Sequence, residues 1–100
     1  MLPDTLTARF VIDSAHPALA GHFPGAPIVP AAVLIERIEH EFRQAGKTLL
    51  GLDRMKFLRP VAPGESVELT LDQLQSSSGP VDLRVDGEVV ARGRWLCQPT

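Results

Sequence analysis

The sequence predicts an α+β fold in which one helix packs against an antiparallel sheet. Residues 5–12 (TLTARFVI) alternate apolar and polar side chains, as a half-buried strand does. Residues 31–45 instead repeat apolar side chains every three or four positions, which is the spacing of one helix face. The rest of the chain alternates again, and Asp86-Gly87 near its end strongly favours a tight β-hairpin. Together these patterns place the single helix between a first strand and a run of later strands.

The helix has a signal at each end. Pro30 suits the first helical position, where the missing N–H costs nothing, and Gly46 suits the position just past the last turn. The predicted apolar stripe consists of Ala31, Ile35, Ile38, Phe42 and Ala45. In the strand before the helix, the predicted inward face consists of Leu6, Ala8, Phe10 and Ile12.

Four strands are expected after the helix. Their predicted ranges are 51–58, 66–74, 81–85 and 88–97. Residues 59–65 (RPVAPGE) form a turn between the first two, and Asp86-Gly87 joins the last two. Because the connections are short, we expect all of these strands to be antiparallel.

Composition limits the classes of function. One hundred residues fit a single domain (1–100), whose thin core we expect a partner subunit to complete. A net charge of −2 without a basic tract gives no reason to expect nucleic acid. No apolar run reaches the roughly 20 residues of a membrane span, and no signal peptide is visible at the N-terminus. Cys97 is the only cysteine and cannot form an internal disulfide, which fits the cytoplasm.

The segment GHFPGAPIVP (21–30) contains a candidate acid–base residue and leads into a candidate oxyanion site. Its three prolines stiffen the chain around His22, whose pKa suits acid–base work near neutrality. The helix that starts at Pro30 offers free amides and a positive dipole end to a developing oxyanion. Glu36 follows in that helix and could donate a proton. This combination suits removal of a proton next to a carbonyl and loss of a β leaving group.

A plainer interpretation stays open for both residues. His22 could simply belong to a stiff turn. Glu36 has His40 four positions later, and Glu39 has Arg43 at the same spacing, as on a solvated helix face with weak ion pairs.

No metal site, thiol nucleophile or cofactor is predicted. The three histidines, at 16, 22 and 40, lack metal-ligand spacing, and Cys97 ends an apolar strand. The sequence also contains no glycine-rich phosphate loop and no serine elbow.

Beyond these patterns, GHFPGAPIVPAAVLIE resembles the signature of the β-hydroxyacyl-acyl-carrier-protein dehydratases of fatty-acid synthesis. GLDRMKFLRPVAPGESVELTL and VDGEVVARGRWLC resemble later segments of the same family, so the similarity extends from Ala8 to Cys97. The resemblance implies the hot-dog fold, in which an antiparallel sheet wraps around one central helix. It also implies a homodimer or higher homo-oligomer with active sites across the interface.

The resemblance further implies a reaction and roles for individual residues. The reaction is loss of water from a (3R)-3-hydroxyacyl thioester, carried by acyl carrier protein or coenzyme A, to give a trans-2-enoyl thioester. His22 matches the histidine that takes the α-proton, and Glu36 matches the carboxylate that protonates the departing hydroxyl of a site on the other subunit. The amide of Ala31 matches the donor to the thioester carbonyl, and Phe23 in the same motif is assigned to substrate binding.

The chain also departs from the family pattern. Ala31 replaces a glycine, and Arg37, Glu39 and His40 replace small or amide-bearing residues. The family's N-terminal helix and first strand have no counterpart here, which predicts a compact member of a specialised fatty-acid, polyketide or aryl-polyene-type pathway. Two alternatives stay open: a catalytically silent or acyl-binding hot-dog subunit, and a thioesterase of the same fold.

Overall fold

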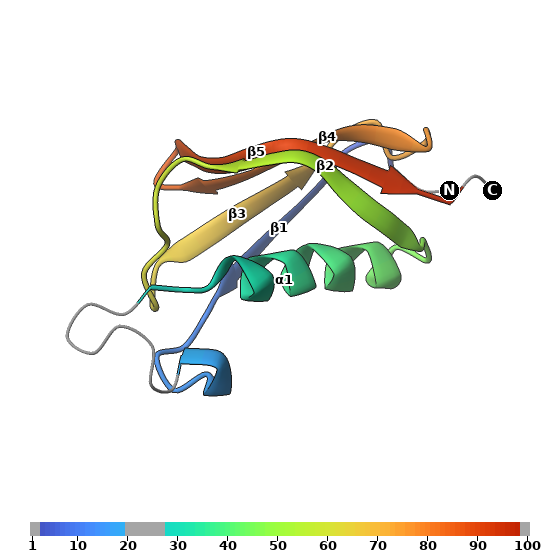
Figure 1. The fold of residues 1–100 in the computed structure, drawn as a ribbon. Helices are drawn as coiled ribbons and strands as arrows, with labels where there is room; N and C mark the ends of the chain where they lie inside the picture. The colour runs from blue at the N-terminus through green and yellow to red at the C-terminus, as the bar shows by residue number, and fades with distance from the viewer. Residues whose placement is uncertain (1–2, 20–27, 99–100) are drawn as a thin grey trace.

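The computed structural model describes residues 3–19 and 28–98, and Figure 1 traces the chain. The elements in chain order are β1 (Leu6–Val11), a short 3-10 helix η1 (Pro17–Leu19), α1 (Ala31–Gln44), β2 (Leu49–Phe57), β3 (Ser66–Leu71), β4 (Ser78–Val85) and β5 (Glu88–Cys97). The predicted order of strand, helix and four strands is therefore confirmed. The short helix η1 was not predicted, because three residues are too few to create a periodic pattern.

All five strands form one antiparallel sheet in the order β1-β3-β4-β5-β2. The two strands that flank the helix in sequence, β1 and β2, thus lie at opposite edges. The β4–β5 hairpin closes between Val85 and Glu88. Its turn residues Asp86 and Gly87 have φ angles of 50° and 80°, so the hairpin prediction is confirmed.

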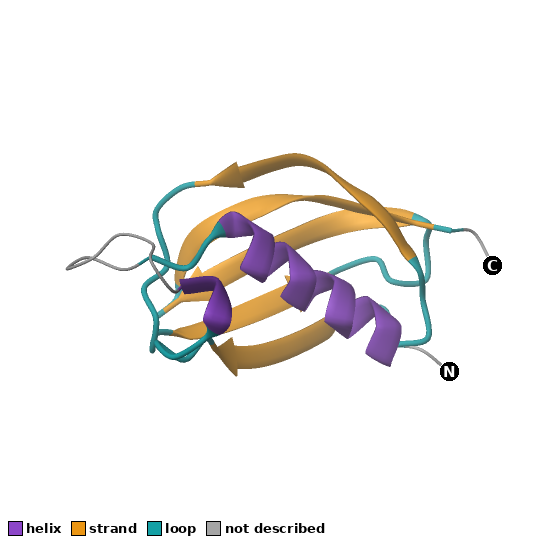
Figure 2. Ribbon diagram, turned by 60° about the horizontal axis from the view of Figure 1, so that its bottom comes forward, coloured by secondary structure: helices purple, strands orange, loops and turns teal. Residues whose placement is uncertain are grey.

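The helix lies along one face of the sheet, and the sheet curves over it (Figures 1 and 2). The core between them contains the rings of Phe42 from α1 and Trp95 from β5, which meet edge to face with centroids 5.2 Å apart. Both side chains are fully buried. The Nε1–H of Trp95 donates to the carbonyl of Asp72 at 3.0 Å, so its one polar atom is also satisfied.

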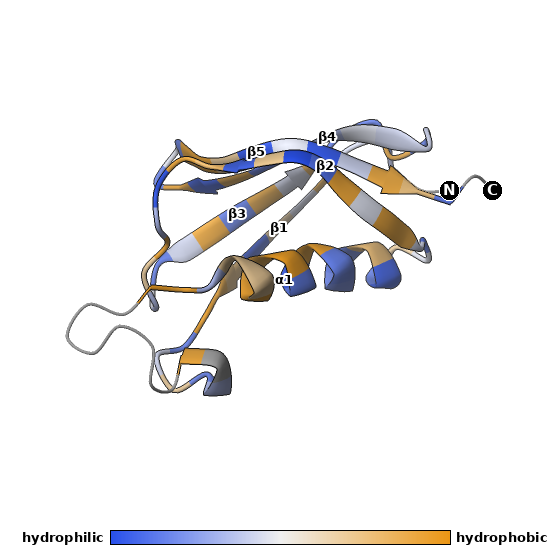
Figure 3. Cartoon of the chain, viewed as in Figure 1, coloured by the Kyte–Doolittle hydropathy of each residue, from blue (hydrophilic) through white to orange (hydrophobic). Residues whose placement is uncertain are grey.

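The buried face of α1 differs from the predicted stripe. Its buried side chains are Val33, Leu34, Ile38 and Phe42. Ile35 is 37% exposed and Ala31 is also exposed, so only Ile38 and Phe42 of the stripe belong to the core. The helix is rotated so that the side with Leu34 faces the sheet. In Figure 3 the hydrophilic residues of α1 lie mainly on the side of the helix that faces away from the sheet.

The strand boundaries also differ from the predicted ones. β2 begins at Leu49 and β4 at Ser78, two and three residues before the predicted starts. Gly79 and Pro80 discourage a strand in sequence, yet they pair with Trp95 and Arg94 of β5. A Cβ at position 79 would lie 2.3 Å from the carbonyl oxygen of Asp72, so this close packing needs glycine. β3 stops at Leu71 rather than at 74.

Candidate active site

An apolar pocket of about 350 Å³ lies between the start of α1 and the chain that follows β2. Its lining residues are Ile28, Val29, Ala31, Leu34, Phe57, Leu58, Arg59, Pro60 and Val61. The amide of Val29 donates to the carbonyl of Val61 at 2.7 Å, which ties the two walls together. The volume lies within the range of small-molecule sites, at the lower end.

The start of α1 supplies hydrogen-bond donors to this region. Pro30 precedes the first turn in an extended conformation, and its carbonyl accepts from the amide of Val33 at 3.0 Å. The amides of Ala31 and Ala32 have no acceptor within the helix, because helix geometry provides none there. Since Ala31 also lines the pocket, the positive end of the helix dipole lies at the pocket wall. Such an end stabilises an oxygen that gains negative charge.

The opposite wall is held by Arg59. Its guanidinium contacts both carboxylate oxygens of Glu65 at 3.2 Å, and its Nε donates to Glu88 Oε1 at 3.0 Å. The amide of Ala62 donates to Glu65 Oε1 at 2.7 Å, which closes the turn. The hydrogen bonds from Arg59 lower the pKa of Glu65, and those to Glu65 and Glu88 raise the pKa of Arg59. The turn is therefore fixed both to itself and to the β4–β5 hairpin.

The predicted site residues do not all meet in this pocket. His22 and Phe23 lie outside the described residues. Ala31 lines the pocket, and the role of its amide in binding a thioester carbonyl stays a prediction. Glu36 is exposed and is not among the lining residues. It lies about half a helical turn round from Leu34 and Ile38, and so on the side of α1 that faces away from the sheet.

Arg37 and Glu39, two of the helix residues that differ from the family pattern, interact with residues outside the pocket. Arg37 lies with its guanidinium 5.2 Å from the centre of the Phe10 ring and pairs with Glu41 at 3.3 Å. Glu39 pairs with Arg43 at 3.4 Å, so that i,i+4 prediction is confirmed. No corresponding ion pair joins Glu36 and His40 among the described residues. None of Arg37, Glu39 and His40 lines the pocket.

The sequence did not indicate the wall formed after β2. Phe57 and Leu58 are 41% and 52% exposed, whereas Val61 is 2% exposed. The available signal was the pair of large apolar residues, Phe57-Leu58, that breaks the alternation of a strand just before a proline turn. Periodicity assigns such a pair to a strand end, and only the fold places it against the helix.

Two other kinds of site find no support in residues 3–19 and 28–98. No three His, Cys, Asp or Glu side chains are grouped there so as to hold a metal ion. No helix in these ranges has the length and apolar character that crossing a membrane requires. Cys97 is 4% exposed and its Sγ lies 3.8 Å from the carbonyl oxygen of Ser76.

Curated relatives of this chain include dehydratases. The 3-hydroxyacyl-(acyl-carrier-protein) dehydratase FabZ of Herpetosiphon aurantiacus is 35% identical over 92 residues, covering 78% of this chain and 65% of the relative. The protein of the same name from Mannheimia succiniciproducens is 31% identical over 98 residues, covering 82% and 65%. The chain thus spans slightly less than two thirds of the length of these relatives.

Solved structures share the fold at low identity. In the dehydratase heterocomplex ApeI:P from Xenorhabdus doucetiae, one chain aligns with a TM-score of 0.82 at 18% identity, covering 96% of this chain and 88% of that one. The (R)-hydratase from A. caviae involved in PHA biosynthesis aligns with a TM-score of 0.64 at 15% identity, covering 100% of this chain and 97% of that one. An acyl-CoA hydrolase from Staphylococcus aureus aligns with a TM-score of 0.61 at 14% identity, covering 96% of this chain and 65% of that one. The predicted hot-dog fold is therefore confirmed, and this fold is shared by different activities.

A match to a family model distinguishes among the families that share this fold. The model described as ApeI dehydratase matches residues 2–94, nearly the whole chain. The chain therefore belongs to the ApeI-like dehydratase family.

Proposed function

We propose that this protein dehydrates a (3R)-3-hydroxyacyl thioester to the trans-2-enoyl thioester. The observation that carries the proposal is the match of residues 2–94 to a dehydratase family model. The apolar pocket that ends at Ala31 supports it, because an acyl chain needs apolar walls and a thioester carbonyl needs a donor beside them. Curated relatives named as dehydratases at 31–35% identity agree with this assignment.

The proposed reaction uses one base and one acid. His22 removes a proton from the α-carbon, and the electrons of that C–H bond form the α–β double bond. The bond from the β-carbon to its hydroxyl oxygen breaks, and Glu36 gives this oxygen a proton, so that water leaves. The amide of Ala31 binds the thioester oxygen while it gains charge, and Phe23 contacts the substrate.

The position of Glu36 favours a site shared between two subunits. Within one chain this carboxylate faces away from the sheet and lies outside the lining of the pocket. The edge strand β2 exposes Leu50 and Phe57, and Leu58 follows it, so the edge favours a covering partner. We infer a homodimer, or a larger homo-oligomer built from it, in which Glu36 serves the pocket of its neighbour.

The substrate carrier and the setting follow from the same proposal. Acyl carrier protein is the expected carrier because the curated relatives bear it in their names, and coenzyme A is the alternative. We place the protein in the cytoplasm, in a dedicated fatty-acid, polyketide or aryl-polyene-type pathway. Nucleic acid has no part in this function.

A silent subunit is the second candidate. The heterocomplex ApeI:P is a precedent for two hot-dog chains assembled together. The side chains of Arg37 and Glu39, which prompted this alternative, are paired on the helix and lie outside the pocket lining. Their positions thus favour an active protein over a silent one.

Complementation between inactive variants tests the dehydratase proposal. His22→Ala and Glu36→Ala should each abolish dehydration, whereas Glu39→Ala, the matched helix carboxylate, should retain it. Refolding the two dead variants together in equal amounts makes half of the dimers mixed, and each mixed dimer has one intact site. About a quarter of the wild-type activity should then return.

Three results would contradict the proposal in different ways. Absence of recovery, with both variants folded and dimeric, would place the acid and base in one chain. Release of free thiol from the thioester without enoyl product would identify a thioesterase. A folded wild-type dimer that converts no 3-hydroxyacyl thioester would identify a silent subunit.

A further inference from the structure

The guanidinium of Arg59 holds main chain as well as carboxylates. Besides its bonds to Glu65 and Glu88, its Nη1 donates to the carbonyl oxygen of Pro60 at 2.7 Å. Among the described residues, Arg59 is the one arginine whose guanidinium donates to a backbone carbonyl. Its planar fork can engage several acceptors at fixed angles, which a lysine cannot do. The side chain therefore fixes the path of the backbone that leads from Pro60 into Val61.

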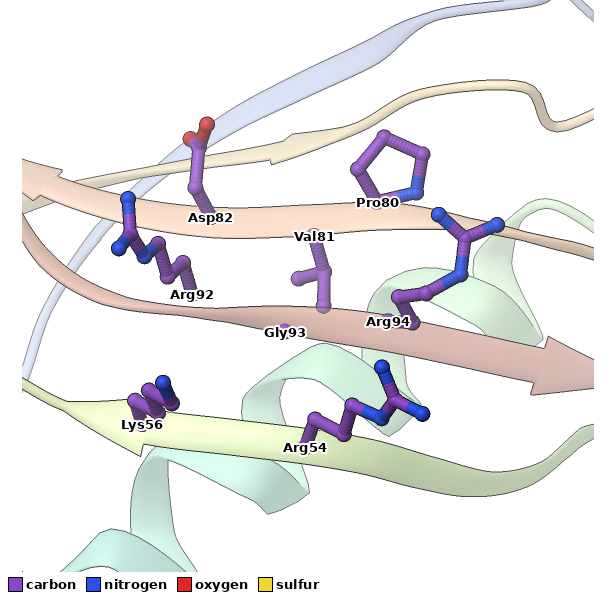
Figure 4. A pocket seen from close by; sticks show the side chains of 8 residues that line it. All are labelled: Arg54, Lys56, Pro80, Val81, Asp82, Arg92, Gly93 and Arg94. Atoms are coloured by element: carbon purple, nitrogen blue, oxygen red, sulfur yellow. The ribbon is translucent and has the colours of Figure 1, made fainter.

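On the outer face of the sheet, opposite α1, the arginines have fewer partners. Figure 4 shows Arg92 and Arg94 on β5 and, across Gly93, Arg54 in a bulge of β2. Arg92 and Arg94 have no hydrogen bond or ion pair in the part of the chain that the structure describes. Arg9 on β1 has a carboxylate partner at 2.9 Å. Loss of such a side chain releases no backbone carbonyl, so these arginines provide matched controls.

A backbone hydrogen bond joins the turn of residues 59–65 to the start of α1. The amide of Val29 donates to the carbonyl of Val61 at 2.7 Å. Both residues are buried, at 4% and 2% exposure, so water does not compete for this bond. The turn is also held on its far side, where the amide of Gly64 donates to the carbonyl of Ile12 at 2.9 Å. A displacement of the turn is therefore transmitted to Val29.

The first turn of α1 has no side-chain cap. Pro30 occupies the N-cap position and makes no side-chain hydrogen bond to the helix, and no acidic residue lies in the first turn. A capping side chain normally fixes the amides at this end of a helix. Here the backbone at Val29, two residues before Ala31, does so instead. The direction of the Ala31 amide thus depends on the bond between Val29 and Val61.

We propose that Arg59 is a positioning residue for the dehydration, an inference that rests on the proposed function. Through the turn it fixes Val29, and with it the amide of Ala31 that binds the thioester oxygen. The donor of an oxyanion site has to lie about 2.7–3.1 Å from that oxygen, and a misplacement of about 1 Å can cost roughly 100-fold in rate. Arg59 lines the same pocket, but its guanidinium is already bound to carboxylates and a carbonyl, so it acts through the backbone rather than on the substrate.

Hydrogen exchange followed by NMR, on the protein without substrate, tests the path to α1. In Arg59→Gln the amide of Val29 should exchange about tenfold faster than in wild type, because its bond to Val61 opens more often. The amide of Leu69, buried in the middle of β3, reports global unfolding. The ratio of the two rates therefore separates local opening from a loss of overall stability.

Two controls remove the same charge without releasing a carbonyl. Arg9→Gln breaks the ion pair to Glu68, and Arg94→Gln removes an arginine that has no partner in the described ranges. Both should keep the ratio of the Val29 and Leu69 rates within about twofold of wild type, as surface substitutions usually do.

A second variant keeps the test available if Arg59→Gln does not fold. Glu65→Gln removes the charge that holds the two-point pair and leaves Arg59 in place. It should raise the relative exchange rate of Val29 by a smaller amount, because the bonds from Arg59 to Pro60 and Glu88 remain. With Arg59→Gln unfolded, an unchanged ratio in Glu65→Gln would overturn the proposal.

Two measurements with small substrates test the effect on the reaction. With 3-hydroxyacyl thioesters of N-acetylcysteamine, Arg59→Gln should lower kcat per folded molecule by about tenfold, less than loss of a whole oxyanion donor costs. KM should stay within about twofold, because the donor matters most in the transition state. A saturated acyl thioester, isotope-labelled at its carbonyl, cannot lose water, and its infrared carbonyl band reports the hydrogen bond directly. That band should lie at lower wavenumber in wild type than in Arg59→Gln, while Arg9→Gln should match wild type.

The outcomes separate the positioning role from the proposed function. If wild type converts no 3-hydroxyacyl thioester, the dehydratase proposal fails, and the exchange ratio and the carbonyl band still decide whether Arg59 positions the start of α1. The positioning role would be overturned by an unchanged ratio in folded Arg59→Gln, by an equal change in Arg9→Gln, or by an identical carbonyl band. A raised KM with unchanged kcat would also contradict it, because Arg59 would then contribute to binding of the ground state.

Discussion

The guanidinium of Arg59 and the carboxylate of Glu65 form a two-point ion pair, with Nη1 and Nη2 each 3.2 Å from a carboxylate oxygen. Glu65 also accepts the amide of Ala62, and Arg59 also reaches Glu88 on the β4–β5 hairpin. One wall of the candidate pocket is therefore fixed by charge at a position where the chain has no regular secondary structure. This pair should make stability depend on pH.

The pKa of Glu65 is lowered from its ordinary value of 4.5 because Arg59 stabilises the ionised carboxylate. Folding thus favours the charged form. The stabilisation is complete above about pH 5 and is lost as the pH falls through the lowered pKa of the folded state. Glu65→Gln should unfold at a lower temperature than wild type at pH 7, and the difference should shrink at pH 3.

Thermal unfolding followed by circular dichroism at both pH values measures this effect. Glu36→Gln is the control, since Glu36 has no ion pair in the described part of the chain, and its unfolding temperature should differ little from wild type at either pH. A Glu65→Gln difference that is as large at pH 3 as at pH 7 would show that the pair does not depend on the carboxylate charge.

Gly93→Ala should destabilise the fold by about 1–3 kcal/mol, the usual cost of forcing extra volume into a packed site. The added Cβ would approach the Cα of Met55 to 2.9 Å, so backbone has to move. Gly51→Ala in the same pair of strands is the control, because a Cβ there meets nothing within 4 Å. Urea denaturation gives both values, and equal stabilities would mean that the bulge adapts freely.

Ala31→Gly should widen the range of accepted acyl chains. The substitution keeps the amide donor and removes a methyl group from the pocket wall. Values of kcat/KM for a series of 3-hydroxyacyl thioesters of increasing length measure the effect, and the gain should be largest for the bulkiest substrates. The same chain-length profile in both proteins would exclude the methyl group as a filter.

Activity should depend on pH in a bell-shaped manner. With His22 as base and Glu36 as acid, the histidine has to be deprotonated and the carboxyl protonated for turnover. The two limbs of kcat/KM then belong to the pair rather than to either residue. A profile that is flat between about pH 5 and pH 9, with activity present, would contradict this assignment.

Leu50→Glu should weaken the homodimer. Leu50 is 63% exposed on the edge strand β2, where a partner strand would cover it, and a buried unpaired carboxylate opposes association. Val11→Glu is the matched control on the opposite edge strand β1, where Val11 is 54% exposed. Light scattering at micromolar concentration should report a monomer for the first variant and a dimer for the second. A dimer in both would place the interface elsewhere.

Strand and helix types followed from the sequence because each element has a clear period and a turn signal at its end. Which helix face is buried did not follow. Leu34 and Ile35 both flank the line through Ile38 and Phe42, and helical spacing alone does not choose between them. In the structure Leu34 is buried, because the strands that pack against α1 come from parts of the chain far away in sequence and cover that side of the helix.

The sequence singled out one wall of the candidate pocket, because Ala31 lies in a stretch of chain with its own proline and helix-start signals. The roles of His22 and Glu36, from the same stretch, stay predictions. The opposite wall of the pocket around Val61 depends on the order of strands in the sheet, which brings the end of β2 beside α1. A periodic pattern contains no information about such a pairing.

The strand order β1-β3-β4-β5-β2 also predicts the order in which the parts of the molecule fold. β3, β4 and β5 are consecutive in sequence and pair with their chain neighbours, whereas Leu6 of β1 must find Leu71 of β3 across most of the chain. Contacts between distant residues form late in folding because closing a long loop costs entropy. The meander from β3 to β5 is therefore the expected folding nucleus, and its amides should exchange with solvent most slowly. β2 joins β5 next, because Phe57 and Ala91 are closer in sequence than Leu6 and Leu71 are. β1 joins last, so the edge of the sheet that β1 forms is expected to be completed last and to open first.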